Sequence, residues 1–301
     1  MTEILDSLGI EFAENEPLSK HSTFRIGGKA DVAVYPKSKE ELRSVIRLCI
    51  DKGIKYAVIG NGSNLLFSDN GYRGAVIFTK KLVGSSIEEK DGYALISAHC
   101  GDSLGGISRK AYLEGYSGLE FCFGIPASVG GAVYMNAGAF GSEISCVLVS
   151  AQLYDAKADQ FRELSAGELD LSYRHSRFMN DDMLICVGAT FKVYKGNGEE
   201  IKARMDEYKA KRMSSQPYDM ASAGSYFKRP EGYYAAKLID DAGLKGLRVG
   251  DAEVSKKHAG FIVNLGEATA EDVLRLAELV KNTIYEKYGV TLESEVRYVE
   301  E

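Results

Sequence analysis

A short glycine-rich loop, Gly60–Asn64 with the sequence GNGSN, is the first segment whose residues could do chemistry. Glycine torsions let successive backbone N–H groups point the same way, and such a nest binds an anion such as a diphosphate. Ser63 and Asn64 add side-chain donors. The spacing is neither GxGxxG nor GxxxxGK[ST], so it indicates neither the doubly wound dinucleotide fingerprint nor a P-loop. An ordinary glycine turn with polar caps explains the loop equally well.

A second segment, GIPASVGGAVYMNAGAFG from Gly124 to Gly141, is built almost entirely from small residues. Small side chains allow a backbone to approach a flat conjugated ring system closely, so the segment is compatible with a flavin. Close packing of a helix against a strand is the alternative explanation.

Three further segments carry groups suited to polar catalysis. Arg174 lies in YRHS, Ser225 follows Ala-Gly in AGSYFKRP, and Glu295 lies in TLESEVRYV, where the two-residue period puts Arg297 on the same face. Each has a simpler interpretation: a surface charge, a turn-forming serine and a solvated strand face. No histidine is spaced as a partner for Ser225, so a nucleophilic serine has little support.

Composition narrows the class of protein. The chain has 301 residues and a formal net charge of −6, which argues against a nucleic-acid binder. Its five cysteines form no CxxC pair and its four histidines lack metal-ligand spacing, so no metal site is expected. No signal peptide or membrane span is predicted, and the expected location is the cytoplasm.

Periodicity predicts an α+β fold, because strands and helices mix without strict βαβ alternation. A helix is expected after Ser38, whose spacing to Glu41 suits a capping box, and it ends at Gly53. Helices are also expected over 104–113, over 202–212 and from Thr269 to Gly289, and strands over 56–59, 74–78, 93–100, 147–154, 184–194, 260–264 and 290–299.

Taken together, the motifs resemble those of the UDP-N-acetylenolpyruvoylglucosamine reductase family over nearly the whole chain. The resemblance rests on the ordered motifs STFRIGG (22–28), GNGSNLL (60–66), GIPASVGGAVYMNAGAFG (124–141), YRHS (173–176), SAGSYFKRP (222–230), KHAGFIVN (257–264) and LESEVR (292–297). The short segment between Tyr173 and Val187 is similar to that of the family's short form.

The resemblance implies a FAD-binding fold of the para-cresol methylhydroxylase type in two parts, residues 1–85 and 86–205. A C-terminal α+β substrate-binding domain, residues 206–301, would follow. It also implies non-covalent FAD, NADPH as hydride donor and a UDP-sugar substrate in peptidoglycan precursor synthesis. No membrane span, nucleic acid or obligate protein partner is expected.

The resemblance also assigns roles to residues. Arg174 would bind the substrate carboxylate, Glu295 would assist it, and Ser225 would donate the proton. The implied cofactor contacts are Gly60, Asn61, Gly62, Ser63, Asn64, Leu65, Gly124, Ile125, Pro126, Ser128, Gly131, Asn136, Ala137 and Gly138. The implied substrate contacts are Arg297, Lys257, Arg229 and Tyr173.

The sequence departs from the family pattern in two places. Ala127 stands where many members have glycine, and Arg229 stands where asparagine is common, which puts one substrate contact in doubt. Two other functions stay open: a different flavin oxidoreductase, and a UDP-sugar-binding protein without enzymatic activity. GNGSN has no adjacent histidine, which disfavours a covalently attached flavin.

Overall fold

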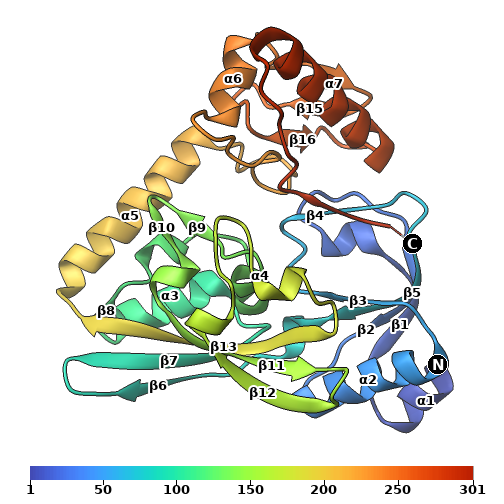
Figure 1. Ribbon diagram of the computed structural model, residues 1–301, viewed down its shortest axis with the longest axis vertical. Helices are drawn as coiled ribbons and strands as arrows, with labels where there is room; N and C mark the ends of the chain where they lie inside the picture. The colour runs from blue at the N-terminus through green and yellow to red at the C-terminus, as the bar shows by residue number, and fades with distance from the viewer. Residues whose placement is uncertain (301) are drawn as a thin grey trace. The chain divides into compact units, whose positions relative to one another are not determined.

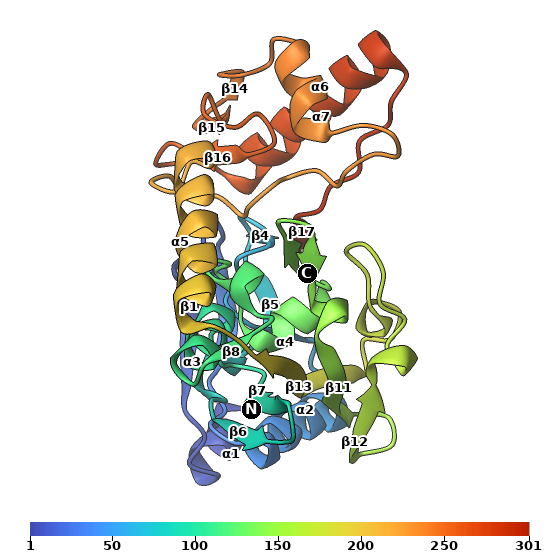
Figure 2. The same cartoon turned by 90° about the vertical axis from the view of Figure 1, so that its left-hand side faces the viewer.

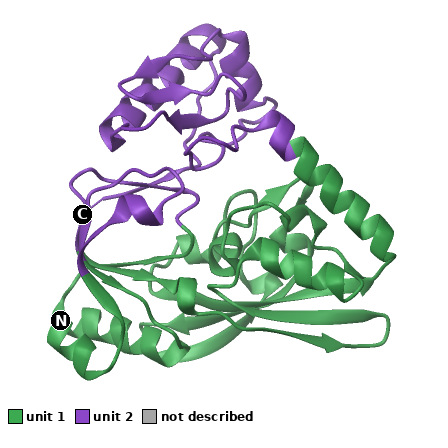
Figure 3. Ribbon diagram, turned by 180° about the vertical axis from the view of Figure 1, so that it is seen from behind, with its two compact units in different colours: residues 1–13, 32–61, 74–211 green, residues 14–31, 62–73, 212–301 purple. Residues whose placement is uncertain are grey.

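The computed structural model describes residues 1–300. The chain divides into two compact units, each assembled from three separate segments (Figure 3). Unit 1 comprises residues 1–13, 32–61 and 74–211, and unit 2 comprises residues 14–31, 62–73 and those from 212 onward. Each unit is described by itself below. The three-segment division drawn from the sequence stays a prediction.

The regular elements alternate irregularly along the chain (Figure 1). The helices are α1 (Thr2–Ser7), α2 (Lys39–Lys52), α3 (Leu104–Leu113), α4 (Val129–Tyr134), α5 (Gly198–Ser215), α6 (Ala235–Asp241) and α7 (Ala270–Tyr288). The longer strands are β1 (Phe12–Pro17), β2 (Lys29–Val34), β3 (Tyr56–Ile59), β5 (Tyr72–Phe78), β6 (Ser85–Glu89), β7 (Tyr93–His99), β11 (Leu148–Asp155), β12 (Gln160–Ser165) and β13 (Leu184–Lys195). The short strands are β4 (Leu65–Phe67), β8 (Tyr116–Ser117), β9 (Gly138–Ala139), β10 (Ser142–Glu143), β14 (Arg248–Val249), β15 (Ala252–Val254), β16 (Ile262–Asn264) and β17 (Arg297–Val299).

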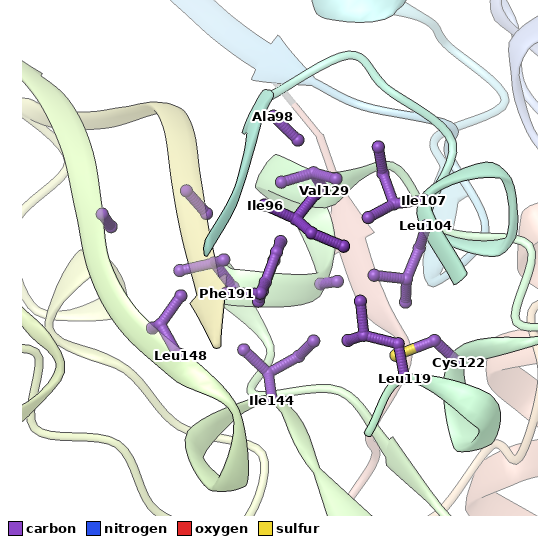
Figure 4. Close-up of a cluster of buried hydrophobic side chains, with 14 of the residues drawn as sticks. Ile96, Ala98, Leu104, Ile107, Leu119, Cys122, Val129, Ile144, Leu148 and Phe191 are labelled. Atoms are coloured by element: carbon purple, nitrogen blue, oxygen red, sulfur yellow. The ribbon is translucent and has the colours of Figure 1, made fainter. Parts of the chain in front are cut away.

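Unit 1 contains an antiparallel sheet with the order β12-β11-β13-β7-β6, and β8 also pairs with β13. Helices α3 and α4 cover one face of this sheet. Figure 4 shows the core between them, where Ile96 and Phe191 from the strands meet Leu104 and Val129 from the helices. Alternate residues of β7 are buried, as expected for a strand with one covered face.

A second sheet has the order β1-β2-β5-β3, and the unit boundaries fall within β1, β2 and β5. Strands β3 and β5 run parallel, with Ile59 opposite Phe78, so both strands end at the same edge. Helix α2 packs its apolar face into the core on this side. The Ser38 side chain accepts from the Glu41 N–H, and Gly53 ends the helix in the left-handed conformation, which confirms the predicted boundaries.

Unit 2 builds its own core from helices α6 and α7 and the sheet β14-β15-β16. In Figure 2 these elements gather around α7. Phe24, Ile26 and Leu66, from the two early segments, are buried in the same core. Strand β4 pairs in parallel with β17, which joins residues 65–67 to residues 297–299.

The N-terminus of α7 is capped twice. Thr269 and Asp272 form a capping box, and Gly289 ends the helix in the left-handed conformation, at the predicted boundaries. In addition, the Asp69 carboxylate accepts from the Ala270 and Glu271 N–H groups at 2.8 and 3.1 Å. A carboxylate at this position also complements the helix dipole. Among residues 1–300, no helix combines the length and the apolar character that a bilayer crossing requires.

The predicted final strand over 290–299 is wrong in extent, because only Arg297–Val299 forms a regular strand. The chain before it is extended but pairs with a different partner. The Glu295 N–H donates to the Tyr226 carbonyl, and Glu293 accepts from the Lys228 N–H. The alternation of polar and apolar residues therefore predicted an extended backbone correctly. It did not predict that residues 293–295 and residues 297–299 pair with different segments.

Candidate functional site

Within unit 1, the start of the GNGSN loop lies directly against the small-residue segment. A Cβ atom on Gly60 would come within 2.1 Å of the Ser128 Oγ, so only glycine fits here. The exposed Asn61 side chain donates to the Pro126 carbonyl at 3.2 Å. Ser128 is buried and caps α4 by accepting from the Gly131 N–H. Two motifs that lie far apart in the sequence therefore meet at one place.

The glycines of the small-residue segment serve two purposes. A Cβ on Gly130 would lie 2.8 Å from the Cys100 Cβ, and one on Gly138 would lie 2.6 Å from the Ser142 carbonyl oxygen. Close packing within the protein therefore accounts for glycine at these two positions, and the predicted contact of Gly138 with the cofactor stays a prediction. A Cβ on Gly131 would lie 3.3 Å from the Ser128 Oγ, its one neighbour within 4 Å, so packing constrains Gly131 less than it constrains the other two glycines. The exposed Asn61 amide, beside a backbone of small and partly exposed residues, is compatible with a cofactor that has a flat ring and a diphosphate.

The rest of the GNGSN loop belongs to unit 2, where it contacts the C-terminal strand. The Asn64 side chain donates to the Glu295 carbonyl at 3.1 Å, and the Asn64 carbonyl accepts from the Arg297 N–H at 3.0 Å. Gly62 has a φ of +63°, and a Cβ there would lie 2.0 Å from the His21 carbonyl oxygen. Asn64 therefore holds the backbone around Glu295, a role that the sequence did not suggest. Ser63 is partly exposed beside it, and Leu65 begins β4.

The other predicted cofactor contacts lie along residues 124–138 of unit 1. Most are partly exposed, namely Gly124, Ile125, Ala137 and Gly138, whereas Asn136 is fully buried. The Asn136 amide hydrogen-bonds Glu143, Ser145 and Ser172, so its side chain is committed to the protein.

Arg174 stands at the tip of a tight turn in unit 1. Ser172 and His175 exchange two backbone hydrogen bonds, of 3.1 and 3.2 Å, across Tyr173 and Arg174. Arg174 has a φ of +54°, an uncommon conformation for a non-glycine residue. Its guanidinium donates to the carbonyls of Asn136 and Gly138 at 3.5 and 3.3 Å and lies 4.9 Å from the Tyr173 ring centre. The structure thus places this cation on the small-residue segment.

Ser225 and Glu295 belong to neighbouring segments of unit 2. Ser225 is exposed and pairs through its backbone with Phe261, and the next residue, Tyr226, accepts from the Glu295 N–H at 2.7 Å. Gly224, immediately before Ser225, has a φ of +80°. Burial raises the pKa of the Tyr226 phenol to about 12, so this residue stays neutral and anchors the segment.

The predicted substrate contacts are distributed over both units. In unit 2, Arg297 is exposed at the start of β17, and the Arg229 guanidinium lies 4.8 Å from the Tyr234 ring centre. Lys257 Nζ donates to the Met213 carbonyl at 2.7 Å. Tyr173 is exposed in unit 1 beside Arg174. These side-chain positions show contacts within the protein only, so the roles of the four residues in substrate binding stay predictions.

Sequence reasoning missed the residues that hold the site together. Glu143, Ser145 and Ser172 surround the Asn136 amide, and nothing in their spacing identifies them. Asn136 itself gives one signal, because asparagine shortly after a helix is typical of a left-handed residue. Its φ is +42°.

Comparison with known proteins covers the whole chain. Residues 216–299 match the family model described as "UDP-N-acetylenolpyruvoylglucosamine reductase, C-terminal domain", and residues 30–162 match a FAD-binding domain. A UDP-N-acetylenolpyruvoylglucosamine reductase from Caldicellulosiruptor saccharolyticus is 46% identical over 99% of this chain and 94% of its own length. One from Clostridium novyi is 46% identical over 97% and 93%.

The chain belongs to the UDP-N-acetylenolpyruvoylglucosamine reductase family.

Membership in this family makes the protein an oxidoreductase and a flavoprotein with a FAD-binding domain, as the sequence predicted. The crystal structure of the UDP-N-acetylenolpyruvylglucosamine reductase from Thermus caldophilus superimposes with a TM-score of 0.80 at 35% identity, covering 97% of this chain and 99% of that one. The expected α+β class, a FAD-binding fold followed by a distinct C-terminal domain, is confirmed.

Proposed function

We propose that this protein uses NADPH to reduce UDP-N-acetylenolpyruvoylglucosamine to UDP-N-acetylmuramate, a step of peptidoglycan precursor synthesis. The observation that carries the proposal is that each unit gathers its own site residues. Arg174 contacts the small-residue segment in unit 1, and the segments of Ser225 and Glu295 pair in unit 2. The names of the full-length relatives supply the substrate class.

The cofactor would be held by the two motifs that meet in unit 1. Asn61 and the backbone near Gly131 would contact FAD, with backbone N–H groups of Gly60–Ser63 facing its diphosphate. FAD, when bound, supplies the redox chemistry, taking two electrons from NADPH and passing them to the substrate double bond. The protein supplies the orientation, the electrostatics and the proton.

Arg174 would bind the carboxylate of the enolpyruvyl group. A guanidinium presents its donors in a planar fork that matches a carboxylate, and its charge does not titrate away. Reduction adds a hydride to the terminal carbon, and negative charge then develops on the neighbouring carbon and its carboxylate. A preorganised cation stabilises that charge more than it stabilises the ground state. Glu295 would assist at the same carboxylate.

Ser225 would then protonate the carbon next to the carboxylate. Ser225 is exposed and follows Gly224, which has a φ of +80°. A proton leaves the Oγ for carbon, and the Oγ regains a proton from a water or a neighbouring acid. The added hydride and proton together complete the reduction of one double bond, which balances the two electrons from NADPH.

Anaerobic stopped-flow absorbance tests the whole proposal. NADPH should bleach the bound flavin, and subsequent addition of UDP-N-acetylenolpyruvoylglucosamine should restore the oxidised spectrum with formation of UDP-N-acetylmuramate. UDP-N-acetylglucosamine, which lacks the enolpyruvyl group, should leave the flavin reduced. A flavin that NADPH cannot reduce, or that the enolpyruvyl substrate cannot reoxidise, would refute the function.

A further inference from the structure

A buried amide lies directly beneath Arg174. Asn136 has no exposed surface, and its backbone adopts the left-handed conformation with a φ of +42°. Burying an amide without hydrogen bonds costs free energy, so its hydrogen-bond partners indicate its structural role.

The Asn136 side chain joins three segments of unit 1. Its Nδ2 donates to the Glu143 Oε1 and to the Ser172 carbonyl, each at 2.9 Å, and its Oδ1 accepts from the Ser145 N–H at 2.9 Å. Glu143 Oε1 also accepts from the Ser145 Oγ at 2.7 Å. Both amide protons and the amide oxygen are therefore used within the protein.

One of these bonds fixes the base of the Arg174 turn. Ser172 is the first residue of that turn, and its carbonyl accepts from both the Asn136 amide and the His175 N–H. The tip of the same turn returns to Asn136, because the Arg174 guanidinium donates to the Asn136 carbonyl at 3.5 Å. Asn136 thus contacts the turn at both its base and its tip.

The other partner, Glu143, lies on a hairpin that is itself held in place. Strands β9 and β10 pair with Gly138 opposite Glu143, and the loop residues Phe140 and Gly141 have φ values of +55° and +84°. Positive φ at both loop positions is the geometry of a two-residue hairpin loop that matches strand twist. The Phe140 ring stacks on Tyr208 of α5 with a centroid distance of 4.3 Å and an interplanar angle of 5°.

We propose that Asn136 is a positioning residue, whose buried amide holds the Tyr173–Arg174 turn so that the Arg174 guanidinium is preorganised for the substrate carboxylate. This inference rests on the proposed role of Arg174. Aspartate at position 136 would keep the shape but replace two donors with acceptors, facing the Glu143 carboxylate and the Ser172 carbonyl. The base of the turn would then lose its bond to the segment beneath it, while the Ser176 Oγ bond to the Tyr134 carbonyl would remain.

The kinetic test compares the two half-reactions of Asn136→Asp at saturating FAD. Flavin reoxidation by the enolpyruvyl substrate should slow by about 10- to 100-fold, since small misplacements of a catalytic group cost this much. Reduction by NADPH should stay within about threefold of the parent. In an Arg174→Ala background, Asn136→Asp should add less than about a twofold further loss, because the two residues act as one unit. Asn15→Asp is the matched control, because Asn15 is exposed and also left-handed, with a φ of +54°.

A second measurement is independent of activity. Trypsin cleaves after Arg174, and a loosened turn should be cleaved about tenfold faster in Asn136→Asp than in the parent or in Asn15→Asp, in proportion to local opening. Should Arg174→Ala leave catalysis intact, the proposed function of Arg174 fails, while the cleavage rate still decides whether Asn136 holds the turn.

Asn136→Gly covers the case in which the aspartate variant does not fold. It removes the amide, keeps the left-handed backbone without strain, and should show the same two defects. The proposal is overturned by unchanged cleavage after Arg174, by a loss that multiplies with that of Arg174→Ala, or by a defect that disappears when FAD is raised. The last result would make Asn136 a cofactor contact instead.

Discussion

Unit 1 and unit 2 differ in how far their site residues depend on side-chain bonds. In unit 1, Arg174 stands on a left-handed turn whose base is held by buried side chains: the Asn136 amide donates to the Ser172 carbonyl, and the Ser176 Oγ donates to the Tyr134 carbonyl. In unit 2, the segments of Ser225 and Glu295 are paired mainly through backbone groups of Tyr226 and its neighbours, and the Asn64 amide adds one side-chain bond to the Glu295 carbonyl. A side-chain anchor is lost with a single substitution, whereas a backbone pairing tolerates new side chains but not the loss of an N–H. The two halves of the site should therefore differ in which substitutions they tolerate.

The largest effect is expected for Ser225→Ala in unit 2. Removing a general acid typically lowers the rate of the catalysed step by about 10²- to 10⁴-fold. The decrease should be confined to flavin reoxidation by substrate. The backbone pairing around position 225 should survive, because alanine keeps every N–H and carbonyl. Stopped-flow traces of both half-reactions make the measurement, with Ser222→Ala as the control from the same segment. Equal slowing of the NADPH half-reaction would mean that Ser225 shapes the site and does not donate the proton.

The next largest effect tests the close contact between Gly60 and Ser128 in unit 1. Gly60→Ala would force a Cβ to within 2.1 Å of the Ser128 Oγ, so the loop or the Ser128 side chain must move, and FAD affinity should fall by roughly tenfold or more. Fluorescence titration of the apoprotein with FAD measures this change. Adding Ser128→Ala removes the clashing oxygen and should recover part of the affinity, less the cost of the lost helix cap. Gly167→Ala, at an open position in the same unit, should leave the affinity unchanged.

A smaller effect tests whether unit 2 depends on its backbone pairing. Lys228→Pro removes the N–H that donates to the Glu293 carbonyl at 2.8 Å and should lower the free energy of unfolding by about 1–3 kcal/mol. Lys228→Ala removes only an exposed ion pair with Glu293 and should cost less than about 1 kcal/mol. Urea unfolding of the two variants compares them. Equal decreases in the free energy of unfolding would show that side-chain contacts, and not the backbone hydrogen bonds, stabilise this segment.

The smallest effect is a pH dependence confined to unit 2. Burial lowers the pKa of His258, which is packed near Lys245 and Asp240, below its ordinary value of 6.5. The unfolded chain therefore binds a proton that the folded unit resists, and stability should fall as the pH drops below about 6.5. Hydrogen exchange of residues 252–264 should rise more between pH 7 and 5.5 in the parent than in His258→Gln, after correction for intrinsic rates. His175→Gln in unit 1 should not change that difference.

Much of the fold could be predicted because the signals were local. The caps at Ser38 and Thr269 and the glycines at 53 and 289 confirmed the ends of α2 and α7. The end of the chain was harder, because extended residues alternate in the same way whichever segment they pair with. Residues 293–295 pair with residues 226–228, and β17 pairs with β4, which no pattern of hydropathy could reveal.

The motifs predict the chemical groups of the candidate site, but they do not reveal the groups that support them. Arg174, Ser225 and Glu295 were identified by resemblance, and the structure adds the bonds that fix their backbones. The Asn136 amide and the Asn64 amide were both expected at the cofactor, yet each is bonded to a segment that carries a catalytic candidate. Such partners lie 36 and 231 residues apart along the chain, so spacing carries no information about them.

The interleaving of the two units has a consequence for synthesis on the ribosome. Residues 14–31 and 62–73 emerge long before the residues from 212 onward, with which they form unit 2. Phe24, Ile26 and Leu66 therefore stay exposed to solvent until the last third of the polypeptide has been translated. Exposed apolar segments of this kind favour association between nascent chains. A fragment beginning at residue 212 would lack these three side chains and strand β4, which pairs with β17. Its hydrophobic core would therefore be incomplete.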